Sequence, residues 1–154
     1  MNYKHHFHAG GFSDVFKHVV LSYTLEKLQE KNTSLTYVDT HAGRGQYYLG
    51  SSDAKKLKEY VFGIDALFNY SKHFTAPKTI QHYMDTVDKT KSNFIYPGSP
   101  KIAEAFMREA DRMILSELQP DEYKFLKDNM YRQDKQIAIH HMDAYAAMKA
   151  FFAA

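Results

Sequence analysis

The chain has 154 residues, of which 44% are hydrophobic and 25% charged, and these fractions exclude a disordered, collagen-like or low-complexity protein. The length suits one domain with one sizeable hydrophobic core. The 20 Lys and Arg against 18 Asp and Glu give a net charge of +2 with His neutral, which is too small for a protein that holds nucleic acid by charge alone.

The first third of the chain predicts an arm, a helix and a strand. Residues 1–12 are polar and aromatic and end in two glycines, so we expect an ordered loop there. Apolar residues at helical spacing predict a helix over residues 13–31, with Ser13 as its N-cap. Residues 35–39 are β-branched and aromatic, which predicts a short buried strand that leads into a glycine-bearing turn.

The rest of the chain predicts helices that alternate with strands. We expect helices over residues 53–70 and 77–91, after Ser99 (as N-cap), after Pro120 and after Asp143, and strands over 112–117 and 136–140. Strands that alternate with helical crossovers predict parallel βαβ units and therefore an α/β fold. Ligands in such folds bind beyond the carboxyl ends of the strands.

Each predicted strand is followed by an acidic residue at this edge of the sheet. Asp39 precedes Gly43 and Gly45, whose missing side chains let backbone approach a ligand closely. Glu117 lies where a dinucleotide-type fold places the carboxylate that accepts the two ribose hydroxyls. Asp143 begins the last helix, where it is placed to accept from an adenine amine. Together they predict a pocket for an adenosine-containing ligand.

Each of these residues also has a simpler interpretation. A single Gly-x-Gly is often a plain turn, Asp143 is a helix cap by position, and Glu117 is a strand end three residues before a proline. The coincidence of three acids favours the pocket. The chain has no Walker lysine pattern, which favours S-adenosylmethionine over phosphate-bearing cofactors.

Five blocks of sequence, in order and at matching spacing, resemble one family over essentially the whole chain. It is the bacterial 23S rRNA adenine-N(6) methyltransferase family of the methyltransferase J type. The blocks are Tyr3-Lys4-His5…Phe7-His8-Ala9-Gly10, Asp14-Val15-Phe16-Lys17-His18, Asp39-Thr40-His41-Ala42-Gly43, Tyr96-Pro97-Gly98-Ser99-Pro100 and Glu117-Leu118.

The resemblance implies a Rossmann-like class I methyltransferase fold with a helical insertion over residues 53–91. It implies that S-adenosylmethionine is held by Lys17, His18, His41, Ser99, Glu117, Asp143 and Ala144. The strand-end pattern adds Asp39 and Gly43 to the predicted cofactor-binding residues. Ala144 departs from the family pattern, which has glycine there and so allows a closer backbone contact. Tyr3, His5 and His8 are expected to face the target adenine or the surrounding 23S rRNA.

The expected reaction is methyl transfer from S-adenosylmethionine to the exocyclic amine of an adenine. Enzymes of this class hold that amine with an Asp-Pro-Pro-Tyr type segment after the fourth strand and stack the extruded base on its ring. This chain has no Pro-Pro pair: its prolines are at 77, 97, 100 and 120. We therefore expect residues 1–154 to form the cofactor-binding part of a domain whose C-terminal strands are missing, and to be inactive alone.

Two alternatives concern the arm and the function class. His5, His6 and His8 have the short spacing of a zinc or nickel site, but only Asp14 follows closely, so we predict nucleotide contact and no metal. The second alternative is a non-catalytic nucleic-acid-binding protein involved in the use of external DNA, against which the small net charge argues.

The compartment is predicted from two further features. The chain has no Cys, which excludes disulfides, zinc fingers and thiol catalysis and fits the reducing cytoplasm. No apolar run approaches the ~18 residues of a membrane span, and the first residues are not a signal peptide. We therefore expect a cytoplasmic protein without membrane contact.

Overall fold

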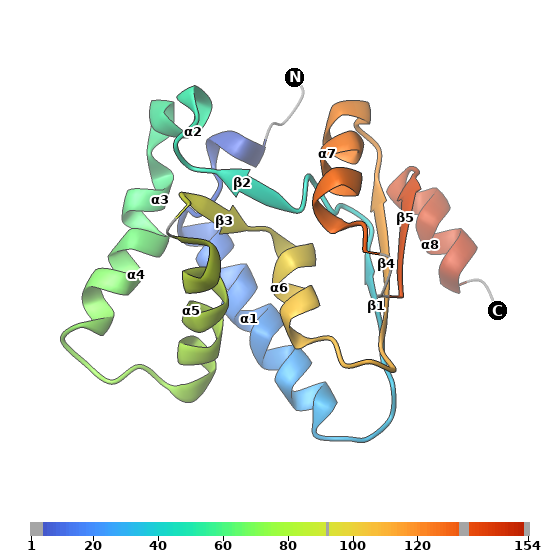
Figure 1. Cartoon of the computed structure of the whole chain (residues 1–154), viewed down its shortest axis with the longest axis horizontal. Helices are drawn as coiled ribbons and strands as arrows, with labels where there is room; N and C mark the ends of the chain where they lie inside the picture. The colour runs from blue at the N-terminus through green and yellow to red at the C-terminus, as the bar shows by residue number, and fades with distance from the viewer. Residues whose placement is uncertain (1–4, 92, 133–135, 153–154) are drawn as a thin grey trace.

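A three-stranded parallel sheet lies on the right-hand side of the molecule in Figure 1. The structure is a computed structural model that describes residues 5–91, 93–132 and 136–152. The strands are β1 (Thr36–Asp39), β4 (Arg112–Glu117) and β5 (Ile137–His141), in the order β1-β4-β5. Asp39 pairs with Leu115 and Glu117 with His141, so the carboxyl ends lie at one edge. The predicted α/β fold with parallel strands is confirmed.

Helices cover both faces of this sheet. α6 (Ser99–Phe106) and α7 (Pro120–Met130) lie on one side, and α8 (Ala144–Phe152) lies on the other (Figure 1). The inward-facing side chains of β4 pack with those of α6 and α7 into a core of buried residues, among them Ala103, Met113, Leu115, Leu126 and Met130. This core holds the strand ends in place.

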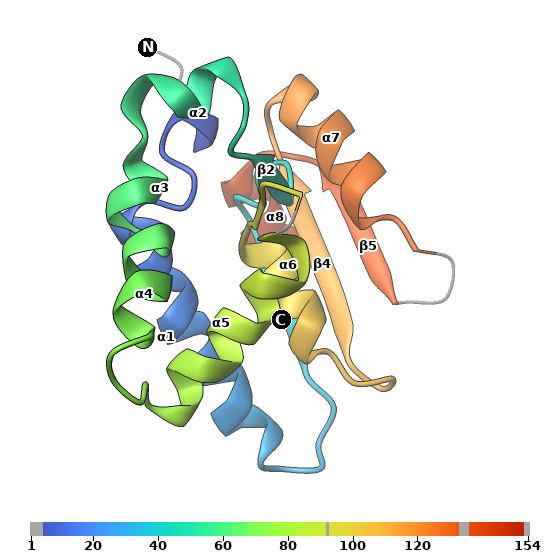
Figure 2. The ribbon, with the colours of Figure 1, turned by 60° about the vertical axis from the view of Figure 1, so that its left-hand side comes forward.

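A second layer of helices stands beside the sheet (Figure 2). It comprises α1 (Phe12–Gln29), α2 (Ser52–Leu57), α3 (Glu59–Phe62), α4 (Ile64–Ser71) and α5 (Lys78–Lys91). Two short strands that the sequence did not predict, β2 (Gln46–Tyr48) and β3 (Ile95–Pro97), pair antiparallel between this layer and the sheet. A second core forms here around Tyr83, Tyr96, Ile64 and Ile102.

The prediction of a single helix over 53–70 is wrong, because the helix is interrupted twice, at Lys58 and at Gly63. Lys58 adopts the left-handed region with φ 52°, and Gly63 follows α3. A Cβ on Gly63 would lie 2.1 Å from the carbonyl oxygen of Gly10, so the arm packs directly on this position. Ser51 caps α2, because its hydroxyl accepts from the N–H of Ala54.

The predicted helix over 13–31 is present as α1, but its N-cap is Gly11 and no side chain caps it. Its inward face is largely polar: Asp14, His18, Ser22 and Leu25 are buried. Several large apolar side chains of the helix face solvent, with Phe16 63% and Val20 48% exposed, and Tyr23 and Leu28 about equally so.

The preceding arm forms a short 3₁₀ helix, η1 (His5–Phe7), in front of α1. Across the described ranges 5–91, 93–132 and 136–152, no helix combines the length and hydropathy that a bilayer span requires.

Candidate functional site

A cleft of about 360 Å³ lies at the carboxyl ends of β1 and β4. Its walls come from η1 and the first turns of α1, the turn after β1, the start of α6 and the end of β4. The structure brings six of the predicted cofactor residues and one predicted substrate residue to its lining: Lys17, His18, His41, Gly43, Ser99, Glu117 and His5.

Asp39 lies behind this lining and holds it in place. Its Oδ2 accepts from the hydroxyl of Ser99 at 2.6 Å and from the hydroxyl of Tyr37 at 2.9 Å, and its Oδ1 accepts from the N–H of His41 at 3.1 Å. Burial and the charge of Asp39 raise the pKa of Tyr37 well above its usual value, so that hydroxyl remains a donor. Ser99 was predicted as the N-cap of α6, but the cap is Gly98, and the Ser99 hydroxyl binds Asp39.

Glu117 joins the ends of two strands. Its Oε2 accepts from the N–H of Gly43 at 2.9 Å and its Oε1 accepts from the N–H of Gln119 at 2.8 Å. A carboxylate has about four acceptor positions, so two backbone donors do not exhaust it. Gly43 has φ +59°, and a Cβ there would lie 2.4 Å from the hydroxyl of Tyr47, so the close approach requires glycine.

A hydrogen-bonded network forms the wall on the side of α1. Asp14 accepts from Nε2 of His5 at 2.9 Å and contacts Nζ of Lys17 at 3.0 Å. Burial alone would raise the pKa of Asp14, but the hydrogen bond and charge of His5 lower it to about 2. Nδ1 of His18 lies 2.8 Å from the hydroxyl of Tyr96, and burial lowers the pKa of His18 to about 4. His18 is therefore a neutral wall residue near pH 7.

Besides Asp39, three predicted site residues that the structure describes do not line the cleft. The side chain of Asp143 caps α8 by accepting from the N–H groups of Tyr145 and Ala146, and Ala144 is the first residue of that helix. His8 contacts Glu59 at 2.8 Å. Tyr3 lies outside the described residues.

The histidines of the arm point to different partners. His5 contacts Asp14, His6 contacts Asp53 at 3.0 Å, and His8 contacts Glu59. Within the part of the chain that the structure describes, no group of three or more His, Cys, Asp or Glu side chains is arranged to hold a metal ion.

Sequence reasoning missed several lining residues, namely Asp14, Tyr47, Gly98, Gln119 and Glu122. Glu122 binds Arg44 through two contacts, one of them 2.8 Å from Nε, and so ties α7 to the turn after β1. Asp14 and Gly98 lie inside motif blocks, which was the available signal. Tyr47 had none, because its strand is only three residues long.

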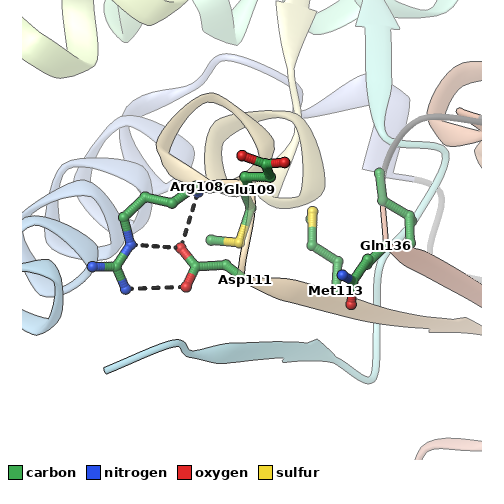
Figure 3. A pocket seen from close by; sticks show the side chains of 7 residues that line it. Arg108, Glu109, Asp111, Met113 and Gln136 are labelled. Carbon is green, nitrogen blue, oxygen red and sulfur yellow. Dashed lines mark hydrogen bonds and ion pairs between the residues drawn. The ribbon is translucent and has the colours of Figure 1, made fainter. Parts of the chain in front are cut away.

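A smaller pocket of about 220 Å³ lies near the opposite end of the sheet (Figure 3). Asp111 of this pocket accepts hydrogen bonds from Nε of Arg108 at 3.0 Å and from the N–H of Leu35 at 2.9 Å. Arg108 also donates to the carbonyl oxygens of Lys31 and Thr33. This arrangement is a brace at the start of β1, and the carboxyl-end cleft is the better candidate site.

Comparison with known proteins decides the family. Residues 32–154 match the family described as "Ribosomal RNA large subunit methyltransferase D, RlmJ". The chain belongs to this family. The resemblance predicted from the motif blocks is confirmed.

Two curated relatives, both named "Ribosomal RNA large subunit methyltransferase J", come from Escherichia coli (strain K12) and Haemophilus influenzae. Each is 36% identical to this chain, over 153 and 154 residues, covering 97% of this chain and 53% of the relative. The crystal structure of protein LPL1258 from Legionella pneumophila superposes with a TM-score of 0.83 at 33% identity, over 95% of this chain and 53% of that one. The chain thus spans about half the length of these relatives.

Proposed function

We propose that this chain forms the cofactor-binding half of an S-adenosylmethionine-dependent enzyme that methylates the exocyclic amine of an adenine in 23S rRNA. The rRNA methyltransferase J names of both relatives support the reaction class. The single observation that supports the cofactor half best is the cleft in which Glu117, held by the backbone of Gly43, faces Lys17 and Ser99.

The arrangement of the sheet supports a Rossmann-like class I methyltransferase domain. The order β1-β4-β5 with helices on both faces is that of a doubly wound sheet. Among the described strands, β1 has a partner on one side only, and α1 exposes large apolar side chains to solvent. We infer that further strands extend the sheet beyond β1, that residues 1–154 are an incomplete domain, and that residues 53–91 are a helical insertion within it.

The residues of the cleft fit S-adenosylmethionine chemically. Its volume lies in the range of small-molecule sites, roughly 300–1,000 Å³. Glu117 is placed to accept from both ribose hydroxyls, and the ammonium of Lys17 matches the carboxylate of the methionine tail. The backbone at Gly43 and Gly98 lets the ligand approach the strand ends. The cofactor supplies a methyl group on a positively charged sulfur.

The substrate side is assigned to the arm. We propose that His5, which lines the cleft, and Tyr3 and His8 contact the adenine or the neighbouring RNA. We also propose that Asp143 and Ala144 contact the adenine ring of the cofactor. Because the chain has no Pro-Pro pair, we assign none of its residues to holding the target amine, and we expect the 154-residue chain alone to be inactive.

Titration calorimetry with S-adenosylhomocysteine tests this proposal. We expect the wild-type chain to bind it and Glu117→Ala to weaken binding at least about tenfold, because hydrogen bonds to a charged group contribute about 1.5–3 kcal/mol. Glu109→Ala, beside the opposite pocket, is the matched control and should bind normally. Absence of binding by the wild type, with salt-dependent binding of DNA instead, would support the nucleic-acid-binding alternative.

A further inference from the structure

Asp14 is a buried carboxylate that no part of the proposed reaction uses. Its side chain is 2% exposed, although it belongs to the first turn of a helix at the edge of the cleft. Its Oδ2 accepts from Nε2 of His5 at 2.9 Å and from the N–H of Gly10 at 3.1 Å, while its Oδ1 contacts Nζ of Lys17 at 3.0 Å. One carboxylate thus joins the arm, the turn after it and α1.

The partners of Asp14 distinguish it from an ordinary structural brace. Two of the three are side chains that line the cleft, namely His5 and Lys17. Lys17 is the only Lys or Arg in that lining as far as the chain is described. Its side chain is 59% exposed, so without the contact to Asp14 its ammonium would sample many rotamers in solvent.

The chemistry of the bond also orients His5. A carboxylate with a pKa of about 2 is ionised near neutral pH and only accepts hydrogen bonds. The proton of the bond therefore belongs to Nε2 of His5, which fixes the orientation of the ring. Because Asp14 is buried between η1 and α1, its carboxylate has little freedom to move, and it restricts the side chains of His5 and Lys17 in turn.

We propose that Asp14 is a positioning residue that holds the Lys17 ammonium where it pairs with the carboxylate of the cofactor's amino-acid tail, and holds His5 on the substrate side of the same cleft. This inference rests on the proposed function. We therefore expect Asp14 to affect the binding of the ligand's amino-acid tail. It should not affect the binding of the nucleoside part, which we assign to Glu117 and Ser99.

The charge of Asp14 could also act on the ligand at long range, but the amino-acid tail has no net charge for it to attract or repel. The tail of S-adenosylhomocysteine carries one ammonium and one carboxylate, so its net charge is zero. Removing the charge of Asp14 therefore leaves little long-range attraction or repulsion, and the loss of a fixed Lys17 remains.

Asp111 is a matched control within the same molecule. It is also a buried aspartate, 4% exposed, whose pKa the hydrogen bond from Arg108 holds well below its usual range. It braces the opposite end of the sheet and does not line the cleft. A loss of stability alone should therefore affect Asp14→Asn and Asp111→Asn alike.

Calorimetry on the full chain with two ligands tests the inference: S-adenosylhomocysteine, and 5′-methylthioadenosine, which lacks the amino-acid tail. We expect Asp14→Asn to weaken the first about tenfold and the second less than about twofold, the former corresponding to one charge-assisted contact. Asp111→Asn should leave the ratio of the two affinities unchanged. Equal loss for both ligands in Asp14→Asn, or no loss, would overturn the inference.

Lys17→Met provides a second route that does not disturb the interior. It should show the same selective loss, and the double variant Asp14→Asn/Lys17→Met should lose little more than either single variant, because both changes remove one contact. Full additivity, or an unchanged ratio in Lys17→Met, would contradict the inference. If the wild type binds neither ligand, the proposed function itself is wrong.

Discussion

The backbone N–H of Gly43 donates to Oε2 of Glu117 over 2.9 Å, and this bond joins the turn after β1 to the end of the neighbouring strand β4. The turn reaches the carboxylate only because Gly43 adopts φ +59°, a region that side chains disfavour. The bond therefore depends on a residue without a side chain at the rim of the cleft. It explains why a Gly-x-Gly turn follows this particular strand.

Gly43→Ala should destabilise the chain by about 2 kcal/mol, because the new Cβ is strained by its φ and meets the hydroxyl of Tyr47 at 2.4 Å. Urea unfolding measures this loss. In a Tyr47→Phe background, which lacks the clashing oxygen, the same substitution should cost less. A penalty that is equal in both backgrounds would show that the contact with Tyr47 does not contribute.

The stability of the chain should fall as the pH decreases from about 6.5 to about 4 through His18. Burial lowers the pKa of this side chain to about 4, whereas the unfolded chain binds the proton near pH 6.5. Between these values the unfolded state holds more protons, so the free energy of unfolding decreases with decreasing pH. His18→Gln should flatten this part of the profile, measured by urea unfolding at several pH values. A slope identical to that of the wild type would contradict the assignment.

The exposed apolar face of α1 should promote self-association of the isolated chain. Phe16 and Val20 lie one helical turn apart on this face, and large exposed apolar surfaces favour association. The double variant Phe16→Lys/Val20→Glu should be monomeric in sedimentation velocity and keep its free energy of unfolding within about 0.5 kcal/mol.

Leu25→Ala, on the buried face of the same helix, is the contrasting variant. Leu25 is 3% exposed, so the substitution should cost about 2–5 kcal/mol. A wild type that stays monomeric at concentrations of tens of micromolar, or a large loss of stability in the double variant, would show that the face of α1 is not an association surface.

The parallel sheet and the strand ends could be predicted from sequence because the signals are local. Residues 112–117 hold the apolar run Met113-Ile114-Leu115 and end in Glu117, and the strand occupies those same positions. The order of strands and helices then determined that the carboxyl ends meet at one edge. That Gly43 and Glu117 share a cleft follows from this topology, whereas Ser99 was placed there by the motif resemblance.

What could not be predicted depends on partners distant in the sequence. β2 and β3 are three residues each and pair across about fifty residues, so neither gives a periodic signal. The apolar pattern of α1 indicated a helix, but it gave no sign that Asp14 and His18 would be buried by bonds to His5 and Tyr96. Asp143 caps α8, as its position allowed, and its contact with the cofactor stays a prediction.

The most direct test of the cofactor assignment is to observe which end of the sheet responds to S-adenosylhomocysteine. In ¹⁵N-resolved NMR spectra of the chain, we expect the amide signals of Gly43, Gly98 and Gln119 to shift on titration. The amides of Leu35 and Arg108, at the brace near the opposite end, should stay in place. Shifts confined to the brace, or no shifts at millimolar ligand, would contradict a cofactor site at the carboxyl ends of β1 and β4.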